Sequence, residues 1–143
     1  ILTFFKNINT VIHFYKVTDH KKENLFLIIC FLLGTLIETT LLNLNIIIHK
    51  GILVEYNIAP LWAISLWVCF GATIYHSFKW MSKQYVISSI LGAMFAPIVY
   101  FSFQALEIIE FGMNNIITAL SVSIVWCLFI PLFIVISDRK FHL

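Results

Sequence analysis

Glu38 is the residue with the clearest chemical potential, because it lies inside a long apolar run. The run covers residues 25–48, reads LFLIICFLLGTLIETTLLNLNIII and has Glu38 as its single charged residue, about 13 residues in. A carboxylate facing lipid near mid-membrane would cost at least about 2.5–3.5 kcal/mol, so it is expected to face the bundle interior or water. There it would be a proton or substrate-coupling site, a polar anchor for a partner, or a protonated acid hydrogen-bonded to a nearby threonine.

His76 is the second candidate, near the end of the apolar run 58–81 and one turn before Trp80. A histidine there can bind a metal, shuttle a proton or contact a lipid head group, or it can hydrogen-bond within the bundle. No His, Cys, Asp or Glu stands three or four residues away, so no metal site is predicted. Glu38 and His76 together form the candidate intramembrane polar site, at different depths and without direct contact.

Small residues recur four apart at Ser88, Gly92 and Ala96, and Pro97 follows directly. A small-xxx-small stripe lets a second helix approach closely. Pro97 is expected to kink or unwind its helix. These four residues are therefore predicted to form a helix-packing surface, with residues 71–72 on the preceding helix as its partner.

The elements that position these residues are predicted to be membrane-spanning helices. The chain is 61% hydrophobic and 11% charged, against about 45–50% and 25% in soluble domains. Four runs are long enough to span a bilayer, at residues 25–48, 58–81, 85–106 and 116–136. Residues 1–17 are predicted to be helical, as a partial span or an interfacial helix. The fold class is all-α, one transmembrane bundle over residues 1–143.

The distribution of charge predicts an orientation. Trp80 with Lys79 and Lys83 is expected to anchor one interface. Segments assigned to that side hold seven Lys and Arg residues, whereas Lys50 is the one basic residue assigned to the other. This bias places the C-terminus in the cytoplasm. The net charge of +2 is too small to predict nucleic-acid binding.

Two short motifs are specific enough to compare with known families. They are H-S-x-x-W from His76 to Trp80 and G-A-x-x-x-P from Gly92 to Pro97. Further positions of the same pattern are Gly34, Glu38, Leu41, Pro60, Trp62, Thr73, Leu91, Glu110, Phe111, Trp126 and Pro131. With these motifs, the chain resembles a bacterial inner-membrane family of unknown function, DUF2878, over about residues 25–136. The resemblance implies an inner-membrane helical bundle and implies no activity.

Three functions remain open from the sequence. The favoured one is a non-enzymatic accessory or assembly subunit that packs against other membrane proteins or its own copies, with no sizeable polar cavity. A small transporter or channel component would line one water-accessible cavity with Glu38 and His76. A lipid-modifying enzyme partner would open a groove sideways to the bilayer beside His76. Catalytic motifs such as H-E-x-x-H and G-x-S-x-G are absent, which disfavours an enzyme, and no cofactor can be named.

Overall fold

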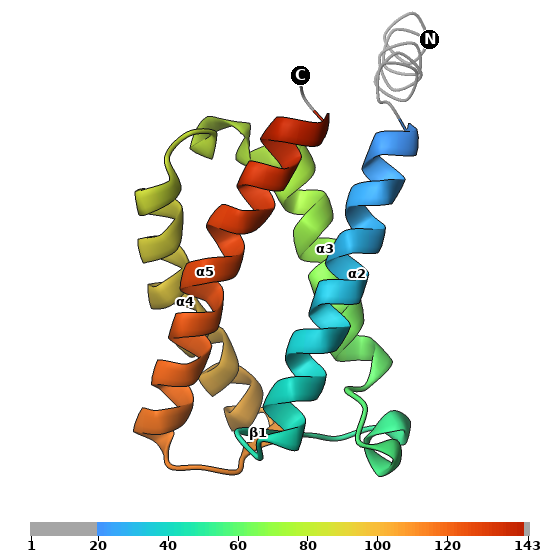
Figure 1. The fold of residues 1–143 in the computed structure, drawn as a ribbon. Coiled ribbons are helices and arrows are strands. Elements are labelled where there is room, and N and C mark those ends of the chain that lie inside the picture. Colours follow the sequence, from blue (N-terminus) through green and yellow to red (C-terminus); the bar gives the residue numbers. More distant parts are fainter. Residues whose placement is uncertain (1–19, 142–143) are drawn as a thin grey trace, which may run out of the picture.

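The computed structural model describes residues 20–141 as a bundle of four α-helices closed at one end by a small sheet (Figure 1). The predicted helix over residues 1–17 lies outside this range. The helices are α2 (His20–Asn43), α3 (Leu61–Ser77), α4 (Tyr85–Ala105) and α5 (Asn115–Phe141). The strands are β1 (Ile47–His49) and β2 (Ile109–Phe111), and the 3₁₀ helices are η1 (Ile52–Tyr56) and η2 (Phe78–Met81).

The helices pack as two pairs, α2 with α3 and α4 with α5. A glycine permits the close approach within each pair. A Cβ atom on Gly71 would lie 2.5 Å from the Cys30 Sγ of α2, and one on Gly92 would lie 2.5 Å from the Trp126 carbonyl oxygen of α5. Gly71 therefore packs against α2, and the expectation that it faces the Ser88–Gly92–Ala96 stripe was wrong. α4 remains helical through Pro97.

Three of these helices, Lys21–Asn43, Tyr85–Ala105 and Asn115–Asp138, are long and apolar enough to cross a membrane. The predicted run 58–81 contains a shorter apolar helix, α3, of 17 residues. α3 begins only after Pro60, and it gives way to η2 at Phe78. Within the predicted run 25–48, the helix ends at Asn43, because the chain turns there and enters β1.

The short sheet joins the α2–α3 connection to the α4–α5 connection at one end of the bundle. β1 and β2 are antiparallel, with Ile47 opposite Phe111 and His49 opposite Ile109. Side chains alternate across a strand, so Ile47 and His49 both point inward and are buried. On the outer side, Lys50 Nζ lies 3.0 Å from Glu110 Oε1. Ile47 and Ile48 were expected to belong to the span 25–48, whereas His49 and β2 were expected to lie in loops. The pairing shows how His49, a polar residue after α2, enters the core.

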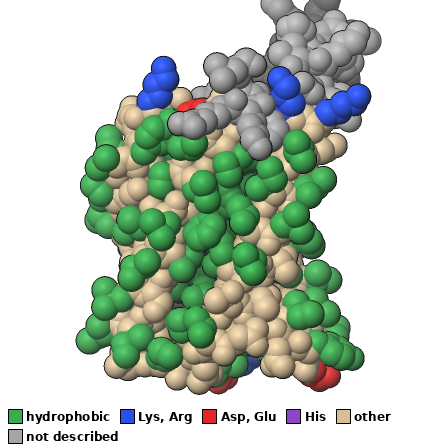
Figure 2. Space-filling model, in the orientation of Figure 1, with side chains coloured by type: hydrophobic (Ala, Val, Ile, Leu, Met, Phe, Trp, Pro, Cys, Tyr) green, Lys and Arg blue, Asp and Glu red, His purple; other side chains and the backbone are tan. Residues whose placement is uncertain are grey.

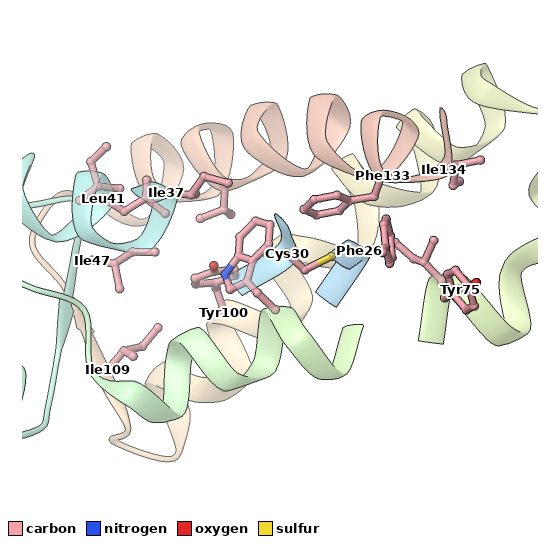
Figure 3. Packing of buried hydrophobic residues seen from close by; sticks show 14 of the residues in the cluster. Phe26, Cys30, Ile37, Leu41, Ile47, Tyr75, Tyr100, Ile109, Phe133 and Ile134 are labelled. Carbon is pink, nitrogen blue, oxygen red and sulfur yellow. The ribbon is translucent and has the colours of Figure 1, made fainter. Parts of the chain in front are cut away.

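The core runs the full length of the bundle (Figure 3). Ile37, Leu41, Ile47 and Ile109 lie toward the sheet end, whereas Phe26, Tyr75, Phe133 and Ile134 lie toward the other end, with Cys30 and Tyr100 between the two groups. The Trp67 ring from α3 stacks on the Trp126 ring from α5, with centroids 4.6 Å apart. This stack joins the two helix pairs across the centre.

On the face of the bundle drawn in Figure 2, apolar side chains form a belt between charged side chains at the two ends. Large hydrophobic side chains are exposed on all the helices, among them Leu36, Leu61, Val86 and Ile116. Lys21 and Lys83 lie exposed at the end where α2 begins, while Glu55, Glu107 and Glu110 lie exposed at the sheet end. Such a belt is the surface expected of a protein surrounded by lipid tails.

The close approach of α4 and α5 gives the first prediction. Gly92→Ala should lower the free energy of unfolding by about 1–3 kcal/mol, because the new methyl group collides with the α5 backbone. In an open helix position, the same change would instead stabilise by up to about 1 kcal/mol. Thermal unfolding in detergent micelles, followed by circular dichroism, measures the effect.

The matched control is Met94→Ala on the same helix, where Met94 is 62% exposed. This substitution should change the free energy of unfolding by no more than about 0.5 kcal/mol. Equal stability of the two variants would contradict the packing described here.

Candidate intramembrane polar site

Glu38 is the centre of a buried hydrogen-bond cluster, defined here as Glu38, His49, Trp67 and Tyr100. Glu38 Oε1 accepts hydrogen bonds from Trp67 Nε1 at 2.9 Å and from the Tyr100 hydroxyl at 2.7 Å. Its Oε2 lies 3.0 Å from His49 Nε2. All four side chains are at least nine-tenths buried. The four residues come from α2, β1, α3 and α4, so the cluster links four separate elements.

Local packing explains how each partner reaches the carboxylate. Gly34 lies one turn before Glu38 on α2, and a Cβ atom there would overlap the Trp67 side chain. The missing side chain therefore lets α3 bring the Trp67 indole close to Glu38. β1 points His49 inward from the other side, and Tyr100 comes from the buried face of α4.

Glu38 lies in the last third of α2, toward the sheet end. It is five residues before Asn43, the last residue of α2. At about 1.5 Å per residue this is roughly 7.5 Å from the helix end. Glu38 is therefore nearer the end of its helix than the run 25–48 suggested, because α2 both begins and ends earlier in the sequence than that run.

The Glu38–His49 pair is buried among apolar groups. In the part of the chain described, His49 is the basic side chain that pairs with Glu38. A carboxyl group in such a place is costly unless it is paired and hydrogen-bonded. The contacts of Glu38 with His49, Trp67 and Tyr100 meet that need.

His49 Nδ1 has no hydrogen-bond partner among the described residues, although it is buried. The same is true of the Trp126 indole Nε1, which lies close to the Tyr100 hydroxyl without meeting hydrogen-bond geometry. Both residues line one cavity, but these two nitrogens have almost no surface open to a water-sized molecule.

The cavity has a volume of about 270 Å³ and lies between α3 and α4, with α5 behind it. Glu38 and His49 line its sheet end, and its wall is almost entirely apolar and aromatic. It reaches from Ile109 at the sheet to Phe70 and Gly92 within α3 and α4. A cavity of about 150 Å³ is enough to hold benzene, so this one has room for part of an alkyl chain or a small ring.

The mouth of the cavity opens on the side of the bundle. Three lining residues are exposed, Leu66 on α3 with Phe95 and Val99 on α4. They belong to the apolar belt, and α3 and α4 are members of different helix pairs. A molecule entering there would come from the lipid phase and not from bulk water.

The structure places His76 away from this cluster. Its Nε2 lies 2.7 Å from Glu23 Oε1, which ties the last turn of α3 to the first turn of α2. Half of the His76 side chain is exposed. The two proposed polar-site residues therefore have different partners, and His76 does not line the cavity with Glu38.

The remaining predicted residues lie along α4 and at the His76 end. Ser88, Gly92 and Ala96 are buried on α4, and Gly92 and Ala96 also line the cavity. Trp80 in η2 and Lys83 in the following turn are exposed; the Lys79 side chain is not among those described. The part of the chain that the structure describes contains no group of three His, Cys, Asp or Glu residues able to hold a metal ion.

The family model described as "Protein of unknown function (DUF2878)" matches residues 2–132. The chain belongs to this family. A search of curated proteins found no match, and a search of solved structures found none either.

Sequence reasoning about this DUF2878 member found Glu38 but missed His49, Trp67 and Tyr100. His49 was assigned to a loop, although three isoleucines before it form a β-branched run directly after the polar Asn43–Asn45 turn. That pattern is typical of a short strand and could have signalled one. Trp67 and Tyr100 carry no comparable signal, since an aromatic residue in an apolar helix is ordinarily part of the core.

The two His–Glu pairs of this DUF2878 protein allow a matched test. His49→Ala should lower the free energy of unfolding by about 3–5 kcal/mol, because it leaves Glu38 buried without its partner. His76→Ala should cost no more than about 1 kcal/mol, because the His76 side chain is half exposed. Unfolding in detergent by a denaturant series measures both, and equal losses would contradict the central role of Glu38.

Proposed function

We propose that this protein is a multi-pass membrane protein that binds one apolar molecule, taken from the bilayer, in the cavity between α3 and α4. The observation that carries the proposal is the lateral mouth, where Leu66, Phe95 and Val99 are exposed within the apolar belt. Ligand sites of this kind are mostly apolar. The lining of this cavity is of that type, with Glu38 and His49 at its sheet end.

The role proposed is non-enzymatic. Both Glu38 oxygens are engaged by hydrogen bonds from Trp67, Tyr100 and His49, which supports a positioning role for the carboxylate over a reacting one. The protein would then act as an accessory subunit that holds or presents a lipid to another membrane protein. The exposed apolar faces of α4 and α5 leave room for that partner or for a second copy.

The cavity also favours lipid binding over a transport pathway. A path based on Glu38 and His76 would need both side chains in one cavity, whereas His76 pairs with Glu23 at the other end. A groove open to the bilayer fits the lipid alternative better, although it lies beside His49 and not beside His76.

We further propose that α3 crosses the membrane as a fourth span. Its 17 residues reach about 25 Å as α-helix. The four residues of η2 continue it by about 8 Å at the 3₁₀ rise. The combined length of about 33 Å matches a hydrocarbon core of about 30 Å. The location proposed is the bacterial inner membrane, with the lysine-bearing end and the C-terminus in the cytoplasm.

Reporter fusions test this topology. A fluorescent protein fused after Leu143 should be fluorescent, and an alkaline phosphatase fused there should be inactive, because the C-terminus stays in the cytoplasm. The same phosphatase fused after Asn57, in the connection between β1 and α3, should be active. Phosphatase activity at Leu143 would contradict the proposed orientation.

Lipid retention tests the binding function. Val99→Phe should reduce the lipid that copurifies in mild detergent by about tenfold, because the larger ring occupies the mouth of the cavity at a cost of about 1–3 kcal/mol. Native mass spectrometry measures the fraction of protein with one lipid bound.

The control is Ile98→Phe, the neighbouring position on α4, which is 59% exposed and outside the cavity lining. It should retain lipid at the wild-type level. Equal retention by the two variants, or wild-type protein free of bound lipid, would overturn the proposal.

A further inference from the structure

The wall of the cavity presents almost no polar surface to a bound molecule. The hydrogen-bond cluster around Glu38 lines its sheet end, but the members of the cluster bond one another. The Trp62 indole N–H donates to the Lys50 carbonyl oxygen. The nitrogens without a partner, His49 Nδ1 and Trp126 Nε1, have almost no surface open to a water-sized molecule. The part of a ligand that enters the cavity therefore meets hydrocarbon and aromatic surface.

The cavity is elongated along the helices. Its lining on α4 runs from Gly92 to Phe103, which is about 16 Å at the α-helical rise. On α3 the lining runs from Trp62 to Phe70, which is about 12 Å. A volume of about 270 Å³ spread over this length fits a chain better than a compact ring system. Since about 150 Å³ holds one benzene molecule, this volume holds roughly eleven carbon atoms.

The mouth lies at the depth of lipid chains. Leu66 is five residues after the start of α3 and Val99 is six residues before the end of α4, and both of these helix ends are at the sheet end of the bundle. At the α-helical rise they are roughly 7.5 Å and 9 Å from it, and Phe95 is about 15 Å from it. Half of a hydrocarbon core is about 15 Å thick. In the bilayer, the mouth therefore faces the chains of the leaflet at the sheet end and not the head groups.

From these three features we infer that the cavity binds the methyl end of one hydrocarbon chain of a membrane phospholipid, with up to about eleven carbons inside. The head group stays outside, at the membrane surface. The inference rests on the proposed lipid-binding function. A polar group drawn into the cavity would lose its hydrogen bonds to water and gain none in return, which is unfavourable. The protein therefore selects its ligand by the chain and not by the head group.

A competition between two chain ends tests the inference. Wild-type protein is equilibrated in mild detergent with equal amounts of two phosphatidylcholines of the same chain length. Both chains of one lipid end in a methyl group, and both chains of the other end in a hydroxyl group. Native mass spectrometry gives the ratio of methyl-ended to hydroxyl-ended lipid bound. We expect a ratio of about ten or more, because the hydroxyl group finds no partner in the cavity.

Val99→Phe assigns this preference to the cavity. The larger ring occupies the mouth, so the lipid that remains bound to this variant lies on the outer surface, and its ratio should be near one. Ile98→Phe, whose site is outside the cavity lining, should keep the wild-type ratio. A preference that is as strong in Val99→Phe as in the wild type would overturn the inference.

A second competition tests the indifference to the head group. Phosphatidylcholine, phosphatidylethanolamine and phosphatidylglycerol with identical chains are offered in equal amounts. We expect the three to bind wild-type protein within about threefold of one another, as a difference below about one tenfold step in affinity. A tenfold preference for one of them would overturn the inference, because it requires contacts with the head group.

These outcomes separate the inference from the proposed function. Lipid bound with a methyl-to-hydroxyl ratio near one would overturn the placement of the chain end and leave lipid binding in place. Absence of methyl-ended lipid from the wild-type protein would overturn the proposed function itself. The wild-type measurements decide both questions even if Val99→Phe does not fold.

Discussion

The carboxylate of Glu38 is the constraint on which this structure depends. Within an apolar bundle, a group with four lone-pair positions needs donors, and no water is at hand to supply them. Three hydrogen-bonding partners reach it, Trp67 from α3, Tyr100 from α4 and His49 from β1. Since each donor belongs to a different element, satisfying one side chain determines how the helix pairs and the sheet are placed relative to one another.

The same constraint explains the cavity. α2 with α3 and α4 with α5 pack closely where glycines permit it, while the two pairs meet through large rings such as the Trp67–Trp126 stack. Bulky aromatic contacts between the pairs leave α3 and α4 apart along one side. The resulting space ends at the polar cluster, so the interaction that joins the bundle also bounds the cavity at the sheet end.

Much of the architecture could be predicted from local features. The runs at 85–106 and 116–136 correspond closely to α4 and α5, because long apolar stretches without polar interruption favour continuous helix. Prediction was poorer at 25–48 and 58–81. Ile47 and Ile48 are as apolar as the helix before them, yet they pair with β2, and hydropathy cannot distinguish a buried strand from a helix end.

By itself, the amino-acid sequence indicated that lipid surrounds this protein and that its fold is helical. A chain this apolar must satisfy its backbone hydrogen bonds internally wherever lipid surrounds it. It also identified Glu38, since a carboxylate in such a run must find partners. Which partners those are was decided only by the tertiary structure. His49 reaches Glu38 through pairing of two strands about 60 residues apart, and His76 finds Glu23 instead. Contacts between residues so distant in sequence depend on packing geometry, which no local pattern contains.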